Sequence, residues 1–495
     1  MNLPRRRYPG EVTRSPVHLF TYSALMQASH DPILAITIEP TRIERFVRPF
    51  QRFIAAETSG GVILLVCTVI ALLWANSAWA ASYFHLWEMP ISLSINGAAF
   101  TLSLHHFIND GLMAVFFFLV GLEIKREVMV GELSSLKAAA LPIAAALGGM
   151  VVPATLYTLL NYGGDGGRGW GIPMATDIAF ALGMLALLGR GAPLGLKVFL
   201  AALAIADDLG AVLVIALFYS AELSWLHLEL AAGMLALLAL ANWLGVRRPL
   251  VYLLLGIVLW WAVLRSGVHA TIAGVLAAMM IPARTRIDSA AFLQGGREIL
   301  NGFERAGFEG EGVLTNQGQQ DAIQALVRAA ELAETPLQRL ERGLHGWVAF
   351  GIIPLFALAN AGVSLQGFGL ESLAQPVTLG VVLGLVFGKP LGITLASWLA
   401  VRTGVGALPE GVSWRALHAV SWLAGIGFTM SLFIAGLAFG EPQQLDAAKV
   451  GVLAASALAA LAGGLLLRGS GARGRGSGET ATTTATPSSP GVAVP

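Results

Sequence analysis

The stretch L-A-I-A-D-D-L-G-A-V, residues 203–212, places two adjacent carboxylates in the middle of a long apolar run. The nearest charged residues on either side are Lys197 and Glu222. Because a helix rises about 1.5 Å per residue, Asp207 and Asp208 are expected roughly 15 Å from a charged end, near the middle of a hydrocarbon layer about 30 Å thick. Each charge there costs on the order of 2.5–3.5 kcal/mol, so the pair indicates an ion or proton site.

The composition of the whole chain agrees with a membrane setting. Of 495 residues, 56% are hydrophobic and 12% are charged. The apolar residues fall into many runs of about 20, which predicts an all-α polytopic membrane protein with the lipid bilayer as its partner. The net charge of +1 offers no argument for nucleic acid, and the single Cys67 excludes a disulfide framework. We expect no cofactor, and the first 30 residues lack the apolar core of a cleavable signal peptide.

The runs predict twelve spans inside a membrane domain of residues 58–467. Residues 1–57 carry eight Arg and no Lys and are interpreted as a basic tail, either a functional arm or a mere extension. Residues 283–345 are interpreted as an inserted cytoplasmic loop with helical segments at 290–306 and 319–332, and 468–495 as a disordered tail. The predicted spans are 58–78, 105–124, 138–160, 170–189, 196–219, 227–246, 249–264, 268–282, 346–364, 376–400, 416–438 and 448–467.

The basic residues between the spans predict the orientation of the chain. Nine Lys and Arg lie in short loops on one side, whereas only Arg168, Arg265 and Lys449 lie on the other. The positive-inside rule then places both termini in the cytoplasm of a multi-pass protein of the bacterial inner membrane. The first external loop, residues 91–104, alternates about Asn96-Gly97 and predicts a β-hairpin, which serves either as a homodimer contact or only as a cap on the bundle.

Few ionisable residues lie deep in the predicted spans. Of nine Asp in the chain only Asp177, Asp207 and Asp208 do so, and of five Lys only Lys389 does. All four are expected at similar depth, and the natural partner of the lysine is one of the aspartates, because opposite charges lower each other's cost. Adjacent helical positions differ by about 100°, so one carboxylate can meet the lysine while the other faces a cavity and takes a cation.

Two of the predicted spans look interrupted. The fourth reads G-I-P-M-A-T-D-I-A-F over residues 171–180, and the eleventh reads L-A-G-I-G-F-T-M-S over 423–431. Interrupted helices in corresponding places of two halves are typical of transporter sites. Their facing ends expose helix dipoles, whose partial charges Asp177 and Lys389 are suited to neutralise. The alternative for Gly425 and Gly427 is close helix packing alone.

Several motifs together resemble one family. They are G-L-E-I-K-R-E (121–127), A-T-D-I-A-F-A-L-G (175–183), A-I-A-D-D-L-G-A (204–211), S-G-V-H-A-T-I-A-G-V (266–275), F-A-L-A-N-A-G-V-S-L (356–365), G-K-P-L-G-I (388–393) and G-I-G-F-T-M-S (425–431). These are similar to the NhaA-type bacterial sodium/proton antiporters, over residues 53–467. The resemblance implies two inverted repeats, spans 3–5 and 10–12, with spans 4 and 11 as broken crossing helices, and a panel of spans 1–2 and 6–9 that forms a dimer.

The same resemblance implies roles for five residues of the membrane interior. Asp208 would bind the transported cation, with Thr176 as an oxygen ligand. Asp207 would pair with Lys389, and one or both would take part in proton exchange. Asp177 would compensate charge at the helix crossing.

Activity in that family rises with pH. The matching positions for this response are Glu123 and Glu127 below span 2, Glu341 and His345 before span 9, and His269. A packed histidine and solvated helix ends are the alternative reading of these five residues. Glu341 and His345 lie at the entry to span 9, where the inserted loop ends, so the pH response is the feature that the resemblance transfers least directly.

The expected function is electrogenic, pH-regulated extrusion of Na⁺ or Li⁺ in exchange for external H⁺, with no organic substrate and no enzyme activity. A hard cation prefers the oxygen ligands that carboxylates, Thr and backbone carbonyls supply. Three rivals are a sodium-coupled symporter, an intramembrane aspartyl protease and a retinal pump. The protease motif G-x-G-D is absent from the chain, and Pro390 directly after Lys389 argues against a Schiff base there.

Overall fold

The computed structural model describes residues 59–95, 98–189, 192–220, 222–307, 316–365 and 374–469. The predicted tails, 1–57 and nearly all of 468–495, lie outside these ranges. Within them the fold is helical apart from two antiparallel strands. The first half of the chain contains α3 (Ser59–Ala75), α4 (Ala80–Glu88), β1 (Pro90–Ile95), β2 (Ala98–Ser103), α5 (Leu104–His106), η1 (Phe107–Leu112), α6 (Met113–Val130), η2 (Glu132–Ser134), α7 (Leu136–Leu160), η3 (Asp165–Met174), α8 (Ile178–Leu188) and α9 (Leu194–Phe218).

The second half continues with helices alone among the described residues. They are α10 (Trp225–Trp243), α11 (Pro249–Ser266), α12 (Ile272–Met280), α13 (Ser289–Arg305), α14 (Gln317–Ala333), α15 (Pro336–Trp347), η4 (Val348–Ile352), α16 (Ile353–Asn360), α18 (Pro376–Leu383), η5 (Gly384–Gly388), α19 (Lys389–Arg402), α20 (Trp414–Ala424), α21 (Phe428–Ala438) and α22 (Pro442–Gly469). Most of these bounds lie within a few residues of the predicted spans.

Length and hydropathy identify fewer membrane-spanning helices among the described residues than the twelve that the sequence predicts. The described residues hold 8 helices long and apolar enough to cross a membrane, or up to 11 if each of three bent pairs counts as one. The predicted span at 268–282 is helical only as α12, whose nine residues reach about 14 Å and do not cross a bilayer alone. The fold is therefore an all-α polytopic membrane protein, and the count of twelve stays a prediction.

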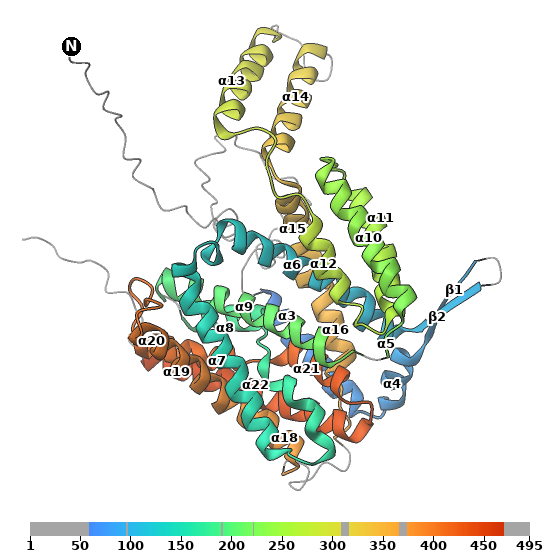
Figure 1. Ribbon diagram of the computed structural model, residues 1–495, viewed down its shortest axis with the longest axis vertical. Helices are drawn as coiled ribbons and strands as arrows, with labels where there is room; N and C mark the ends of the chain where they lie inside the picture. Colours follow the sequence, from blue (N-terminus) through green and yellow to red (C-terminus); the bar gives the residue numbers. More distant parts are fainter. Residues whose placement is uncertain are drawn as a thin grey trace, which may run out of the picture.

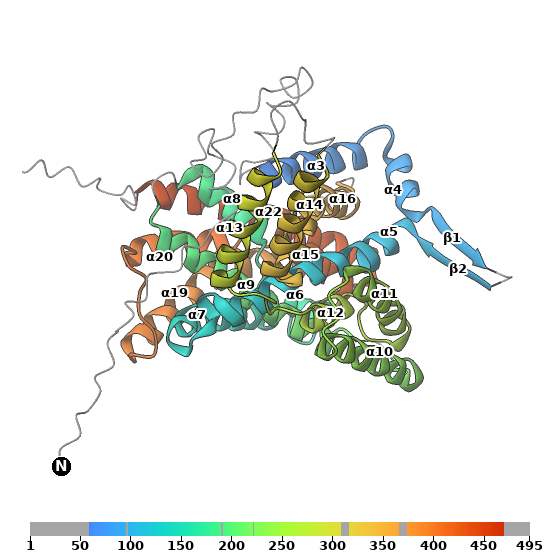
Figure 2. The ribbon, with the colours of Figure 1, turned by 90° about the horizontal axis from the view of Figure 1, so that it is seen from above.

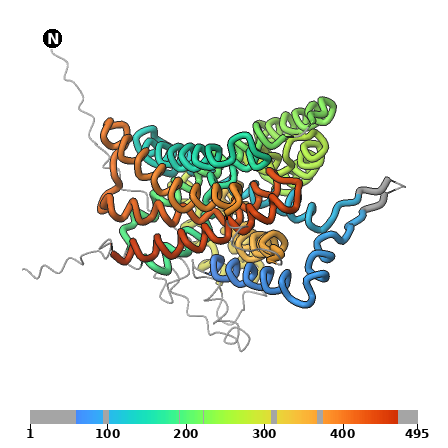
Figure 3. The backbone as a smooth tube through the Cα atoms, turned by 90° about the horizontal axis from the view of Figure 1, so that it is seen from below, coloured from blue at the N-terminus to red at the C-terminus, as the bar shows by residue number. Residues whose placement is uncertain are grey.

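The helix that carries Lys389 lies directly against α7 (Figures 1 and 3). Gly148 of α7 and Gly392 of α19 face each other, and a Cβ added at Gly392 would lie 3.0 Å from the Cβ of Val152 and closer still to the Gly148 carbonyl. Glycine on both helices lets the two backbones touch, as small residues do in membrane bundles. This contact places Lys389, the first residue of α19, deep inside the bundle.

The predicted β-hairpin is confirmed. Strands β1 and β2 pair antiparallel from Pro90↔Ser103 to Ile95↔Ala98, and the turn residues Asn96 and Gly97 lie outside the described residues. The hairpin projects sideways from the helical body (Figure 2).

The inserted segment forms a helical hairpin of α13 and α14 that extends beyond the other helices (Figure 1). The next helix begins at Pro336 rather than at residue 346, where the predicted span starts. Thr335 caps it, accepting a hydrogen bond from the Gln338 backbone N–H at 3.1 Å within a capping box, and proline is well suited to the first helical position. Glu341 and His345 consequently lie on a helix, α15, and not in a loop.

Candidate ion site

Two interrupted helices meet in the interior of the protein. The axis from η3 to α8 bends by 46° across residues 175–177, and that from α20 to α21 by 45° across residues 425–427. The breaks contact each other, since the Asp177 backbone N–H donates to the Ile426 carbonyl at 2.7 Å. A Cβ on Gly425 would lie 2.5 Å from the Leu385 carbonyl, so this glycine serves both the break and close packing.

Asp177 lies where the N-termini of α8 and α21 converge. One carboxylate oxygen accepts from the Phe180 backbone N–H at 2.9 Å and caps α8. The other accepts from the Thr429 backbone N–H at 3.1 Å and from the Thr429 hydroxyl at 2.6 Å. Helix N-termini carry partial positive charge, so one buried carboxylate compensates two helix ends.

Lys389 lies at the same helix crossing, beside the negative C-terminal end of η3. Its ammonium group donates to the carbonyl of Met174, the last residue of η3, and to Asp207 Oδ2 at 2.6 Å. Both charged side chains are 1% exposed. The ammonium therefore compensates the negative end of η3 and the Asp207 carboxylate together, which offsets part of the cost of burying either charge.

Thr176 joins this pair to the second broken helix. Its hydroxyl lies 2.6 Å from Asp207 Oδ2 and 2.9 Å from the carbonyl of Ala424, the last residue of α20. A hydroxyl has only one proton to donate, so the two acceptors share it. The structure thus places Thr176 against Asp207, whereas the sequence suggested a place beside Asp208.

Asp208 differs from the other buried charges because nothing described in the structure satisfies it. Its side chain is 1% exposed, and both of its oxygens, together with Asp207 Oδ1, have no hydrogen-bond partner among the described residues. The charged groups that act on it are Asp207, Glu123, Asp177 and Lys389. Unsatisfied buried carboxylate oxygens are costly, and carboxylate oxygen is a ligand type suited to a hard cation or to a proton.

Four of the five residues predicted to control the pH response lie around Arg126. Its guanidinium donates to Glu341 Oε1 at 2.6 Å and to Glu127 Oε1 at 3.1 Å, and it also acts electrostatically on Glu123 and His345. Glu127 further accepts from the Glu132 backbone N–H at 3.1 Å. This cluster joins α6 to α15. Arg126 lies inside the motif at 121–127, but its role as the centre of the cluster depends on α15 packing against α6, which no pattern in the sequence predicts.

His269 lies apart from that cluster. Its Nδ1 is 2.8 Å from the Thr271 hydroxyl, and its Nε2 is 3.6 Å from Asp110 Oδ1. Its ring packs edge-on against Phe433 of α21. Asp110 lies near the start of a predicted span rather than in its middle, so its position in the sequence gives no sign of this contact. The contact of Thr429 with Asp177 depends on the folded chain, so the interrupted stretch alone does not predict it.

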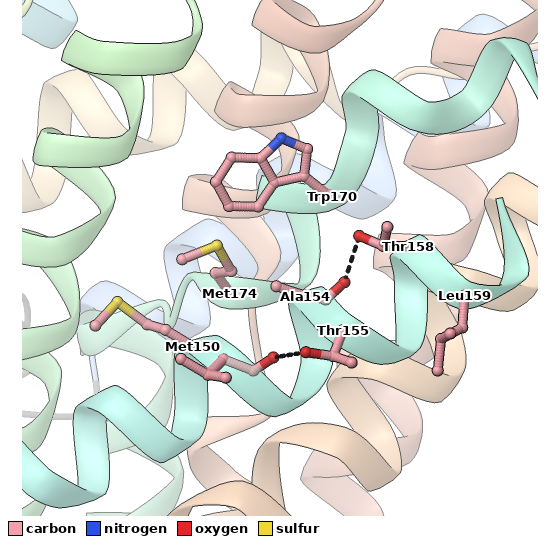
Figure 4. Close-up of a pocket in the computed structure, with 8 residues that line it drawn as sticks. Met150, Ala154, Thr155, Thr158, Leu159, Trp170 and Met174 are labelled. Carbon is pink, nitrogen blue, oxygen red and sulfur yellow. Dashed lines mark hydrogen bonds between the residues drawn. The ribbon is translucent and has the colours of Figure 1, made fainter. Parts of the chain in front are cut away.

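An apolar groove of about 340 Å³ lies beside the ion site, between α7 and η3 (Figure 4). Met150 and Met174 line it at one end and Trp170 at another. The hydroxyls of Thr155 and Thr158 donate to carbonyls of their own helix, at 2.7 and 2.8 Å, so neither proton is available to a ligand. None of the buried charged residues lines this groove, which is therefore distinct from the ion site.

A membrane bundle in which two broken helices meet beside buried carboxylates and a buried ammonium has the architecture of a secondary transporter. Comparison with known proteins agrees. The sequence model of a family described as Na⁺/H⁺ antiporter 1 matches residues 51–467. The Na⁺/H⁺ antiporter NhaA of Oleidesulfovibrio alaskensis is 53% identical over 87% of this chain and 95% of its own length. Those of Koribacter versatilis and Acidithiobacillus ferrooxidans are 51% and 50% identical, over 86% and 85% of this chain and 92% and 97% of theirs.

The chain therefore belongs to the NhaA family of Na⁺/H⁺ antiporters. Its class is that of an antiporter and not of an enzyme.

Proposed function

We propose that the protein extrudes Na⁺ or Li⁺ in exchange for external H⁺ by alternate occupancy of Asp207 and Asp208. The observation that carries this proposal is the set of three buried carboxylate oxygens that have no hydrogen-bond partner in the part of the chain that the structure describes. A cation or a proton satisfies such oxygens, and the two compete because each removes the negative charge that attracts the other.

Asp208 is the primary cation ligand in this proposal, because no described residue forms a hydrogen bond with either of its oxygens. Asp207 Oδ1 lies on the adjacent residue and is also free to contribute, whereas Asp207 Oδ2 is held by Lys389 and Thr176. A cation drawn between the two carboxylates weakens the ion pair of Asp207 with Lys389. The lysine is then free to lose its proton, so Asp207 and Lys389 carry the proton exchange while Thr176 keeps the Asp207 carboxylate in place.

Alternating access requires the core to move against the rest of the bundle. We assign α7, η3/α8 and α9 to one repeat and α18/η5/α19, α20/α21 and α22 to an inverted second one, each with a broken helix in its middle. Asp177 and Lys389 neutralise the facing helix ends in both conformations. Twelve crossings, with α12 as part of one of them, keep both termini in the cytoplasm.

The decisive experiment measures ΔpH on adding Na⁺, Li⁺ or K⁺ to proteoliposomes. We expect a response to Na⁺ and Li⁺, none to K⁺, and loss of the response in Asp208→Asn. Asp288→Asn, which changes an exposed cap of the peripheral helix α13, is the matched control and retains exchange. Normal exchange by Asp208→Asn would show that the cation assignment is wrong.

Electrogenicity and pH regulation are further parts of the proposal. If more protons enter than Na⁺ leave, a valinomycin-clamped potassium potential changes the exchange rate; an unchanged rate contradicts electrogenic exchange.

The pH response is assigned to His269 and to the cluster around Arg126, which consists of Glu123, Glu127, Glu341 and His345. Arg126→Gln then shifts the pH profile of the rate, because it removes the cation that joins α6 to α15.

We also propose a homodimer in the bacterial inner membrane, formed through the β-hairpin. The hairpin projects away from the helical body, where a second copy can reach its paired strands (Figure 2). Removing residues 92–101 should convert the dimer to a monomer in light scattering of the detergent-solubilised protein. An unchanged mass would exclude the hairpin as the contact.

A further inference from the structure

The interface between α19 and α20 contains a chain of polar side chains outside the ion site. His418 of α20 lies with Nδ1 2.9 Å from the Thr394 hydroxyl of α19, and its Nε2 is 3.1 Å from Trp422 Nε1. The Thr394 and Ser421 hydroxyls are 3.3 Å apart, and the Ser421 hydroxyl donates to the His418 carbonyl at 2.6 Å. Ser421 is fully buried, whereas His418 and Thr394 are half-buried.

Donor chemistry gives these hydrogen bonds one direction. An indole N–H can only donate, so Nε2 of His418 must accept and the neutral ring carries its proton on Nδ1. That proton goes to the Thr394 oxygen. Since the Ser421 proton is used on the His418 carbonyl, the Ser421 oxygen accepts from Thr394. Every donor in the chain has one acceptor, and this holds only for the neutral, Nδ1-protonated imidazole.

The chain fixes α20 against the segment that carries Lys389. Thr394 lies five positions after Lys389 on the same helix. Trp422, at the other end of this series of hydrogen bonds, also packs edge-on against Phe387, with ring centroids 5.9 Å apart. Phe387 lies two positions before Lys389. Two side chains of α20 therefore contact the helix of Lys389 on either side of that lysine: His418 contacts Thr394, and Trp422 contacts Phe387.

The position of α20 matters because its last residue reaches the ion site. Ala424 follows Trp422 by two residues, and its carbonyl shares the Thr176 proton with Asp207 Oδ2. If α20 shifts away from α19, this carbonyl shifts too, and the hydroxyl reorients between its two acceptors. Asp207 then changes its hydrogen bonding, and with it the arrangement of the unpartnered oxygens on Asp207 and Asp208.

We propose that His418 is a positioning residue for cation binding: its neutral ring joins Thr394 to Trp422 and so holds the Ala424 carbonyl at the distance that Thr176 requires. The proposal rests on the proposed function, because it needs Thr176 and Asp207 to belong to the transport site. His418 itself touches neither the cation nor the buried carboxylates.

The test compares variants that remove one link at a time. Thr394→Val deletes the central hydroxyl with little change of shape, Thr394→Ser restores it, and Trp422→Phe removes the indole N–H but keeps an aromatic ring against Phe387. Thr403→Val is the matched control, since Thr403 is an exposed threonine directly after α19 whose hydroxyl donates to the carbonyls of Leu399 and Ala400 within that helix. The KM for Na⁺ and the maximal exchange rate are measured in proteoliposomes.

Loss of one neutral hydrogen bond predicts a KM for Na⁺ about 3- to 10-fold higher in Thr394→Val and Trp422→Phe, with the maximal rate within about twofold of wild type. Thr394→Ser and Thr403→Val should keep the wild-type KM. A wild-type KM in Thr394→Val, or the same defect in Thr394→Ser, overturns the inference while the proposed function stands. If the wild-type protein exchanges no Na⁺, the proposed function fails, and the inference fails with it.

Discussion

Replacing Asp177 with Asn tests whether a single buried charge holds the two broken helices together. The native carboxylate accepts three hydrogen bonds with its two oxygens: one from Phe180 and two from Thr429. An amide has one accepting oxygen and one donating nitrogen. Whichever way the Asn side chain turns, its NH₂ group faces at least one donor, so at least one bond is lost together with the charge.

The cost follows from these contacts. If the amide oxygen faces Thr429, the helix cap at Phe180 is lost, which costs about 0.5–2 kcal/mol. Two helix N-termini, at α8 and α21, also lose a compensating negative charge, at about 0.3–1 kcal/mol each in exposed settings and more when buried. The sum predicts a destabilisation of about 1–4 kcal/mol. We expect a corresponding fall in exchange, since the crossing orients both Thr176 and the Ile426 carbonyl.

The assay is thermal unfolding of the detergent-solubilised protein, followed by tryptophan fluorescence, alongside exchange in proteoliposomes. Asp288→Asn is the control, because it is the same substitution at the N-cap of α13, where the side chain accepts one bond at 2.7 Å and is exposed. Asn is as good a cap as Asp, so this control should unfold like wild type. An Asp177→Asn protein with the midpoint of the control would refute the reasoning.

Three other substitutions test the packing around the site. Lys389→Met should lower the free energy of unfolding by about 3–5 kcal/mol, because it leaves Asp207 buried without its cation. Adding Asp207→Asn should recover part of the thermal stability, and equal unfolding midpoints for the single and double variants would contradict the role of the ion pair. Gly392→Ala should lower the unfolding midpoint, since overpacking costs about 1–3 kcal/mol, whereas Gly436→Ala, with open space around its Cβ, should not. Tyr219→Phe removes the hydroxyl that donates to the Arg168 carbonyl at 2.8 Å, and should lower the free energy of unfolding by about 0.5–1.5 kcal/mol in the same assay. An unchanged midpoint would show that this hydrogen bond to η3 does not stabilise the fold.

Much of the fold follows from counting apolar residues along the chain. The ends of α7, α9 and α11 fall within two residues of the predicted spans, because each is a continuous apolar run between polar ends. Predicted and observed helices differ where hydropathy and helix length disagree. Helix α15 is too polar for an apolar count to detect its first turns, although Thr335 and Pro336 mark its start, and α12 is apolar but too short to cross.

For the ion site too, the sequence predicts some features and the folded structure decides the others. The sequence by itself predicted that Asp177, Asp207, Asp208 and Lys389 lie at similar depth, because the expected depth depends only on the number of apolar residues on either side. It could not determine which aspartate meets the lysine, since Asp207 and Lys389 are 182 residues apart. That choice depends on the rotation of α9 about its own axis.

Only the tertiary structure decided that rotation. Met150 of α7 packs against Gly210 of α9, and the glycine contact between α7 and α19 brings Lys389 onto the same side as Asp207. Neighbouring positions on a helix point about 100° apart, so the rotation that pairs Asp207 leaves both Asp208 oxygens without a partner among the described residues. The unsatisfied carboxylate is a consequence of how three helices pack, and no pattern in a single segment encodes it.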